Sequence, residues 1–286
     1  MASLERIGIM QGRLVDPVGD RIQAFPYSRL EEELSICDEL RLGCIEWVYD
    51  YEFAERNPLH LDRCVSAGLT EILSKYDVRV NSVIADYFMV DRLFGKSGLE
   101  LRGSIQVLEK LIVNCAHAGI PLVEIPFVDS AHLETKEIRS EVVSNLMPIV
   151  SFAASKNIKI SLETALPPDL FRRFLEEFEP LTVYANYDIG NSAAMGFDPR
   201  EEIYTLGSRI INVHVKDRCL SGGTVPLGSG NADFDTVFSS LCDIGYSGDY
   251  VLQAAREDLI GAPDKPDPRE TIASYLAFLE EFRLER

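Results

Sequence analysis

The feature that most constrains the fold is a repeated pairing of a short apolar run with a stretch of helical periodicity. Eight such runs occur along the chain, at residues 6–10, 44–48, 78–84, 122–127, 158–163, 183–188, 210–215 and 250–253. This alternation is typical of parallel strands joined by helices. The β-branched residues Ile210, Ile211 and Val213 crowd one run, which suits a strand covered on both faces.

The eight units predict an α/β fold, a closed (β/α)8 barrel that forms a single domain over residues 1–286. The chain has 286 residues, and barrels of this kind reach roughly 250 residues as one unit. An open, doubly wound sheet follows the same local rules. However, the first strand is followed by Gln11, Gly12, Arg13 and Leu14, without the GxGxxG turn of dinucleotide-binding sheets. The sequence therefore favours barrel closure.

Several helix boundaries carry their own signals. Ser28 and Glu31 have the spacing of a capping box at the start of a helix. Asp198 followed by Pro199 predicts a second helix start, with proline in the first helical position. An apolar stripe within residues 234–241 predicts a third helix, which ends before a glycine.

The charge of the chain bears on its partners. A formal net charge of -18 repels nucleic acid and anionic membranes, so we expect neither as a partner. A small anionic substrate is compatible with this charge, because a pocket needs only one or two local cations or backbone amides. The first residues, MASLERIGIM, lack the features of a secretory signal. We therefore expect a cytoplasmic protein with a small-molecule substrate, and a homo-oligomer stays open.

Four late strands end in polar residues, and in a barrel the active site lies at the carboxyl ends of the strands. These residues are Glu163, Asp188, His214 and Gln253. Two carboxylates and an imidazole from adjacent strands suit a divalent cation, Mn²⁺, Mg²⁺, Co²⁺ or Zn²⁺, and Gln253 could add a neutral oxygen. A single strand-end carboxylate is more often a helix cap or an ion-pair partner. Three ligand types in successive strands favour a metal site.

Other residues near the expected barrel mouth suggest anion binding. Gly228, Ser229 and Gly230 follow the seventh strand, where barrels often bind phosphate through backbone amides. Arg13 and Arg256 could form bidentate contacts with a phosphate or a carboxylate. A glycine-rich turn without a ligand and surface salt bridges are the alternative interpretations.

The same residues resemble a known family. Glu163 and the segments 188–191, 214–217 and 226–230 are similar to those of sugar-phosphate isomerases and epimerases, hexulose-6-phosphate isomerases among them, within the xylose-isomerase-like barrels. The similarity spans essentially the whole chain. It implies metal ligands from strands five to eight, at Glu163, Asp188, His214 and Gln253.

Two positions depart from that family. The usual eighth-strand Glu is Gln253, and Asn191 stands where relatives often carry a His three residues after the Asp. In the epimerases, paired carboxylates on opposite faces of the substrate exchange a proton, and a Gln cannot ionise. A mechanism that uses a carboxylate at position 253 is therefore not available.

The resemblance implies a metal-dependent isomerase or epimerase that acts on a sugar phosphate or a related ketose or polyol. Glu163 is the expected base, with the metal stabilising an enediolate. A second acid or base must come from elsewhere. The candidates are Glu46, Asp86, Glu124 and Lys216, of which Glu46 and Asp86 are favoured; each could instead serve as a hydrogen-bonding partner of another site residue.

Three other functions remain as alternatives. A metal-dependent dehydratase or lyase of the same barrel group needs only one base, which Gln253 would permit. A barrel that has lost catalysis and binds a sugar or a partner protein is the second. Apurinic endonuclease activity is the least favoured, because those relatives use more histidines and bind DNA.

Overall fold

The computed structural model of the chain describes residues 5–19, 21–61, 63–179, 181–256, 267–282 and 284, with the backbone alone for 63–67. The statements below concern these residues.

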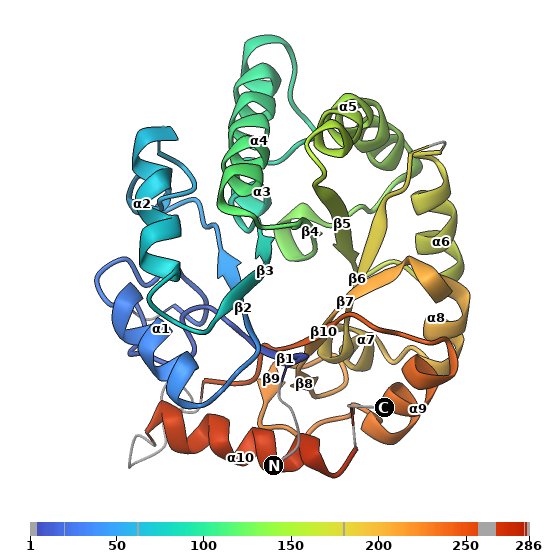
Figure 1. The fold of residues 1–286 in the computed structure, drawn as a ribbon. Helices are drawn as coiled ribbons and strands as arrows, with labels where there is room; N and C mark the ends of the chain where they lie inside the picture. The colour runs from blue at the N-terminus through green and yellow to red at the C-terminus, as the bar shows by residue number, and fades with distance from the viewer. Residues whose placement is uncertain are drawn as a thin grey trace.

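Eight parallel strands close into a barrel, in the order β1-β10-β7-β6-β5-β4-β3-β2 (Figure 1). The strands are β1 (Ile7–Met10), β2 (Cys44–Val48), β3 (Arg79–Ile84), β4 (Leu122–Phe127), β5 (Lys159–Thr164), β6 (Tyr184–Asp188), β7 (Ile210–Val215) and β10 (Asp249–Leu252). The eight predicted strands are confirmed, with ends that differ by at most one residue. Because β1 pairs with both β2 and β10, the alternative of an open sheet is wrong.

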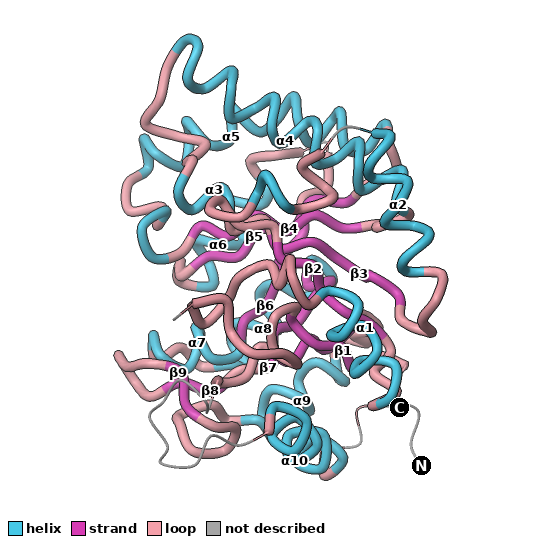
Figure 2. The backbone as a smooth tube through the Cα atoms, turned by 90° about the vertical axis from the view of Figure 1, so that its left-hand side faces the viewer, coloured by secondary structure: helices cyan, strands magenta, loops and turns pink. Residues whose placement is uncertain are grey.

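Helices surround the barrel, and a side view shows the strands running between them (Figure 2). The longer helices are α1 (Leu30–Glu39), α2 (Arg63–Leu73), α4 (Gly98–Ala118), α5 (Lys136–Ser155), α6 (Pro168–Glu176), α8 (Pro199–Leu206), α9 (Phe234–Asp243) and α10 (Pro268–Glu280). Short helical turns also occur, at α3 (Tyr87–Val90), α7 (Ile189–Met195), η1 (Ala54–Arg56), η2 (Asp129–Ala131) and η3 (Gly207–Arg209). In the described part of the chain, every helix is too short or too polar to cross a bilayer.

The predicted helix starts have different outcomes. The Asp198 side chain accepts hydrogen bonds from the amides of Arg200 and Glu201, with Pro199 opening α8 as predicted. The capping box at Ser28 is wrong, because α1 begins one residue later, after Arg29, without a side-chain cap. The reason is a turn before the helix, in which the Arg29 amide donates to the Pro26 carbonyl at 2.9 Å.

A small hairpin follows β7, and the apolar pattern of the sequence did not predict it. It consists of β8 (Asp217–Arg218) and β9 (Thr224–Val225), which pair antiparallel. Two-residue strands are too short to show a period in the sequence. The hairpin matters for function, because it brings residues after β7 to the carboxyl end of the barrel.

The interior of the barrel is partly polar. Side chains alternate along each strand, so residues of one parity pack against the helices and those of the other parity face inward. A small apolar cluster of Met10, Val48, Ile84 and Val251 is separate from the main core. Beside it lie buried polar side chains of the same parity: Glu46, Ser82, Glu124, Ser161, Asn186 and Asn212. The polar layer supports the site above it.

Trp47 anchors β2 to the helix layer. Its side chain is fully buried, its ring lies 5.3 Å from that of Phe25, and its Nε1 donates to Asn57 Oδ1 at 3.0 Å. Replacing Trp47 with Ala should lower the free energy of unfolding by about 3–5 kcal/mol, since it leaves a large cavity. Chemical denaturation measures this, with Leu99→Ala as the control, because Leu99 is 85% exposed. Equal losses for both variants would contradict this role for Trp47.

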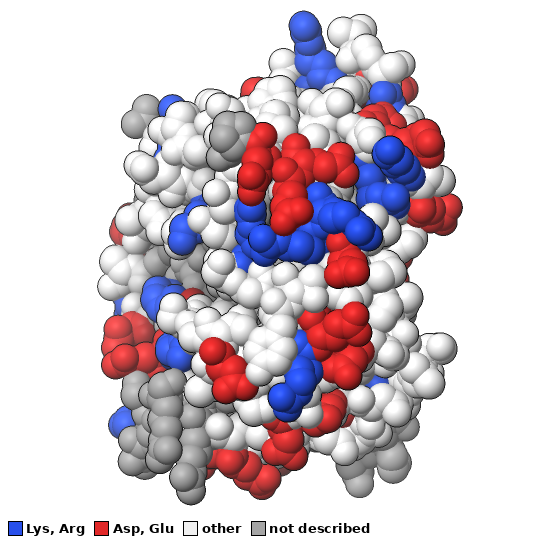
Figure 3. All heavy atoms as spheres, turned by 90° about the vertical axis from the view of Figure 1, so that its right-hand side faces the viewer, with Lys and Arg blue, Asp and Glu red and all other residues white. Residues whose placement is uncertain are grey.

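Charges are mixed on the face that lies to the right in Figure 1. Figure 3 shows Lys and Arg side chains bordered by Asp and Glu on this face. Ion pairs such as Arg172–Glu176 on α6 and Arg209–Glu179 contribute to the pattern. The described basic side chains there are interleaved with acidic ones, as the charge of the whole chain leads one to expect.

Candidate metal centre and substrate pocket

A pocket of about 680 Å³ opens at the carboxyl ends of the strands. Its volume falls within the range of small-molecule sites, about 300–1,000 Å³. The polar residues that line it come from β5 and from segments after β1, β3, β4, β6, β7 and β10: Arg13, Gln23, Asp86, Asp129, Glu163, Asn191, Lys216, Arg218, Ser221, Thr224 and Gln253. The position is the one expected for the active site of a barrel.

Three of the predicted ligands meet beside this pocket, and one of them, Glu163, lines it. Glu163 on β5, Asp188 at the end of β6 and His214 on β7 place their ligand atoms within 4.8 Å of one another. His214 Nδ1 lies 3.3 Å from Glu163 Oε2 and 3.8 Å from Asp188 Oδ2. All three side chains are buried. The geometry brings together residues that are far apart in the sequence.

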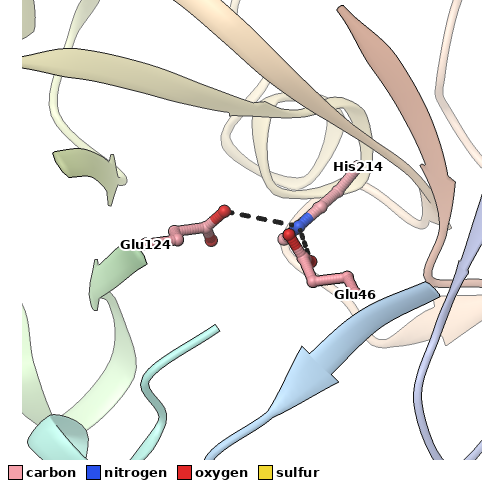
Figure 4. A group of neighbouring side chains, drawn as sticks. All are labelled: Glu46, Glu124 and His214. Carbon is pink, nitrogen blue, oxygen red and sulfur yellow. Dashed lines mark hydrogen bonds and ion pairs between the residues drawn. The ribbon is translucent and has the colours of Figure 1, made fainter. Parts of the chain in front are cut away.

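A second group of carboxylates lies beneath His214 (Figure 4). His214 Nε2 lies 2.6 Å from Glu46 Oε2 and 3.5 Å from Glu124 Oε2. Glu46 also accepts hydrogen bonds from Ser82 Oγ at 2.5 Å and from Asn212 Nδ2 at 2.8 Å. Glu46 and Glu124 are fully buried, and neither lines the pocket.

The partners of His214 determine which nitrogen faces the ligand cluster. The Glu46 carboxylate accepts a hydrogen bond from the ring, so it favours a proton on Nε2 of His214. On the other side of the ring, Asn186 Nδ2 lies 3.0 Å from Nδ1 and also donates to Glu163 Oε2 at 2.9 Å. An amide NH₂ can only donate. In neutral His214 the lone pair of Nδ1 therefore accepts from Asn186, and a cation bound at Nδ1 would take the place of that hydrogen bond. A carboxylate behind a ligating imidazole is the usual support for a metal-bound His.

The cluster favours positive charge. Burial opposes a charged His214, but the carboxylates of Glu124 and Glu46 outweigh it and raise the pKa of the imidazole well above its ordinary value. For the Glu124 carboxyl, burial disfavours the charged form and so raises the pKa. For Asp188, burial acts in the same direction, yet Lys216 and His214 hold its pKa below the ordinary value. An ionised Asp188 is the form that a cation requires.

Lys216 connects Asp188 to Gln253. Its Nζ lies 2.6 Å from Asp188 Oδ2 and donates to Gln253 Oε1 at 2.9 Å. Gly190 makes room for the lysine, because a Cβ at that position would lie 2.8 Å from Lys216 Cγ. The Lys216 ammonium thus lies between the carbonyl oxygen of Gln253 and the Asp188 carboxylate.

Asn191 takes over the position where the family often carries a His. Asn191 Nδ2 donates to Glu163 Oε1 at 2.6 Å, and its Oδ1 accepts from Arg218 NH1 at 2.8 Å. Glu163 therefore receives one amide hydrogen bond on each carboxylate oxygen, from Asn186 and from Asn191. These bonds fix the orientation of the Glu163 carboxylate toward the pocket.

The residues expected to bind anions are divided between the pocket and its surroundings. Arg13 lines the pocket and donates to the Ile22 carbonyl and to Gln23 Oε1. Arg256 is buried, and its guanidinium holds the carbonyls of Gly12 and Val15.

The glycine loop lies outside the lining of the large pocket. The Gly230 amide donates to Asp217 Oδ2 at 2.8 Å and the Ser229 amide donates to the Pro226 carbonyl at 3.0 Å. A Cβ at Gly228 would contact Phe278. The loop thus uses these two amides internally, to hold the hairpin after β7.

The donor set fits a divalent cation. Glu163 and Asp188 would supply carboxylate oxygens, His214 would supply Nδ1, and Gln253 would supply a neutral oxygen. Such a mixture of oxygen and nitrogen ligands suits Mn²⁺, Mg²⁺, Co²⁺ or Zn²⁺.

Comparison with known proteins agrees with this architecture. The family model described as xylose isomerase-like TIM barrel matches residues 34–282. The chain belongs to this family. Among curated members, L-ribulose-5-phosphate 3-epimerase UlaE of Escherichia coli (strain ATCC 8739) is 24% identical over 235 residues, which are 78% of this chain and 81% of UlaE. Relatives of this xylose isomerase-like barrel therefore include sugar epimerases.

Solved structures show the same fold. D-psicose 3-epimerase, determined in the presence of D-fructose, superposes with a TM-score of 0.74 at 14% identity, covering 96% of this chain and 97% of the epimerase. The IOLI protein with a zinc atom has a TM-score of 0.74 at 16% identity, covering 97% of each chain. The xylose isomerase-like fold is thus shared over nearly the full length of the chain.

Several site residues were missed by sequence reasoning. Asn186 and Asn212 lie two residues before Asp188 and His214, on the same inward face of their strands. The period of two could have identified them, had it been extended back from each strand end. Gln23 and Arg218 lie in a loop and a short hairpin, and the sequence carries no local signal for their role.

Proposed function

We propose that the chain is a divalent-metal-dependent epimerase or isomerase that acts on a ketose or a ketose phosphate. The observation that carries this proposal is the convergence of Glu163, Asp188 and His214, with Glu163 lining a pocket large enough for a sugar. The sugar epimerases among its relatives support the same class of reaction.

Glu163 is the proposed base that removes a proton next to the substrate carbonyl. Its carboxylate lines the pocket and is oriented by the amides of Asn186 and Asn191. When bound, the metal would polarise the carbonyl and stabilise the negative charge that develops on its oxygen. A base held in a fixed orientation contributes to the rate because little reorganisation is needed during proton transfer.

The structure separates the four candidates for the second acid or base. Asp86 and Lys216 line the pocket, whereas Glu46 and Glu124 lie beneath His214, outside its lining. We therefore propose a residue of the lining, and neither Glu46 nor Glu124, for proton transfer to the substrate. Burial raises the pKa of Asp86 to about 7, which suits a group that both gives and takes a proton near neutral pH. Asp86 is the preferred second group, since Lys216 is engaged by Asp188 and Gln253.

A phosphate group on the substrate would find cations in the pocket. Arg13, Lys216 and Arg218 are the basic residues of its lining. Guanidinium groups bind phosphate well, because they donate hydrogen bonds in a planar, bidentate arrangement. The Ser229 and Gly230 amides already donate to Pro226 and Asp217, so we assign the proposed phosphate contacts to Arg13 and Arg218, which line the pocket.

A dehydratase or lyase is the second candidate, favoured by the amide of Gln253. Such a reaction needs one base and a departing hydroxyl, so the loss of a carboxylate at position 253 does not impair it. The small-molecule substrate and the metal would be the same in both cases.

The two reactions differ in the mass of the product. We expect protein loaded with Mn²⁺ to convert at least one member of a panel of ketoses and ketose 5- and 6-phosphates. In D₂O, an epimerase or isomerase that exchanges its proton with solvent gives a product that carries one deuterium and keeps all its oxygen. A dehydratase gives a product that has lost water. Mass spectrometry separates these outcomes, and binding of a sugar without any exchange or conversion would indicate a non-catalytic barrel.

A further inference from the structure

A chain of side-chain hydrogen bonds crosses the mouth of the pocket. Gln23 Nε2 donates to Asp86 Oδ2 at 2.7 Å, and Gln253 Nε2 donates to Gln23 Oε1 at 3.1 Å. Lys216 Nζ then donates to Gln253 Oε1 at 2.9 Å. Gln23 belongs to the loop between β1 and α1 and is 230 positions from Gln253 in the sequence. Because β1 and β10 are neighbours in the barrel, the loop after β1 links Gln253, just after β10, to Asp86, after β3.

A glutamine at a ligand position raises a problem that a glutamate does not. A carboxylate presents an oxygen in either orientation of its terminal group, whereas an amide presents an oxygen on one side and an NH₂ on the other. Only the oxygen can coordinate a cation. Where Gln253 replaces the Glu of the family, some neighbour must select between the two orientations.

The neighbours of Gln23 determine the orientation of its amide. Arg13 NH2 approaches Gln23 Oε1 at 3.2 Å, and a guanidinium can only donate. On the other side, Gln23 Nε2 donates to Asp86 Oδ2 at 2.7 Å, so the NH₂ of Gln23 faces Asp86. Arg13 and Asp86 therefore demand the same orientation of Gln23, with the oxygen directed toward Arg13 and Gln253.

The orientation of Gln253 follows from that of Gln23. Because Gln23 presents its oxygen, Gln253 must present its NH₂ to it, and the Gln253 oxygen then points to the opposite side. That side holds Lys216, whose ammonium can only donate, and Asp188 lies 2.6 Å from the same ammonium. Each hydrogen bond in this series from Arg13 to Lys216 has one consistent arrangement of donor and acceptor.

We propose that Gln23 is a positioning residue that holds Gln253 with its carbonyl oxygen toward the cation position, in the direction set by Arg13 and Asp86. This inference rests on the proposed function, because it assumes that Gln253 serves the metal centre. Gln23 compensates for the change from Glu to Gln at position 253. The loop that carries it is anchored in turn, since the Phe25 amide donates to the Asp50 carboxylate at 2.7 Å.

The test is the affinity for Mn²⁺, measured by calorimetric titration of the full chain in four variants. Gln23→Met keeps the size of the side chain but removes both hydrogen-bonding groups, and we expect it to weaken Mn²⁺ binding by about tenfold, as for other groups that orient a ligand. The matched control is Gln106→Met, the same chemical change at an exposed position of α4, which should bind Mn²⁺ like the wild type.

The other two variants remove the need for orientation. In the Gln253→Glu variant the carboxylate presents an oxygen to the metal in either orientation. Adding Gln23→Met to this variant should therefore change the Mn²⁺ affinity by less than about twofold. The contrast between the two backgrounds distinguishes orientation of Gln253 from a general loss of structure, which would weaken binding in both.

Three results would count against the inference. If Gln23→Met binds Mn²⁺ as tightly as the wild type, or if it weakens binding equally in both backgrounds, Gln23 does not position Gln253. If the wild type itself takes up no Mn²⁺, the proposed metal-dependent function fails, and the role of Gln23 fails with it. The first two results leave the proposed function intact.

Discussion

Replacing Glu163 with Gln should reduce kcat by at least about 10²–10⁴-fold, the usual contribution of a positioned acid or base. The amide keeps the size of the side chain but cannot accept the proton, and it removes one charged ligand from the cluster around His214. The measurement is steady-state kinetics on a ketose or ketose phosphate that the wild type converts, with Mn²⁺ saturating for both proteins. Saturation separates the loss of the base from weaker metal binding.

The control for this substitution is Glu177→Gln, the same change at an exposed position after α6. It should leave kcat unchanged, and thermal melts should show that both variants fold. If Glu163→Gln keeps the kcat of the wild type, Glu163 is not the base. If the variant keeps its full sugar affinity and the wild type shows no turnover, the chain is a binding barrel.

Removal of the metal should abolish turnover. Without a cation, the Glu163 and Asp188 carboxylates lie side by side at His214 Nδ1, and no metal polarises the substrate carbonyl. Dialysis against a chelator should bring the rate to background, and Mn²⁺ should restore it. Full turnover by protein that contains far less than one metal ion per chain, measured by elemental analysis, would refute metal dependence.

The same experiment has a readout that does not depend on activity. A ligand that binds only the folded protein stabilises it by about 2.7 kcal/mol when present at 100 times its dissociation constant. Mn²⁺ at that concentration should therefore raise the denaturation midpoint of the chelated protein. Asp188→Asn should lose most of this stabilisation, since it removes a charged ligand. If Mn²⁺ leaves the denaturation midpoint of the chelated protein unchanged, this cluster does not bind the metal.

Much of the fold follows from local sequence patterns. Short apolar runs, each followed by a helical period, identified the eight barrel strands, and Asp198 with Pro199 identified the start of α8. The capping box at Ser28 failed because a turn at Pro26 shifts the helix start by one residue. The hairpin of β8 and β9 escaped detection because its strands have only two residues each.

The convergence of the three proposed metal ligands could be predicted from the sequence for a simple reason. In a parallel barrel all strands end on the same side, so polar residues at the ends of successive strands must come near each other. Glu163, Asp188 and His214 follow from this rule alone. The rule does not say which buried carboxylate faces the pocket, and so Glu46 and Asp86 could not be separated until the structure placed one beneath His214 and the other in the lining.

The sequence by itself determined the alternation of strands and helices and the side of the barrel on which the chemistry lies. These are local properties, since the period of a strand and the residue at its end are set by a few neighbouring positions. Only the tertiary structure decided how the polar interior is connected. The contacts of Glu46 with His214 and of Gln23 with Gln253 join residues 168 and 230 positions apart, and they form only when the barrel closes and the first loop folds over its mouth.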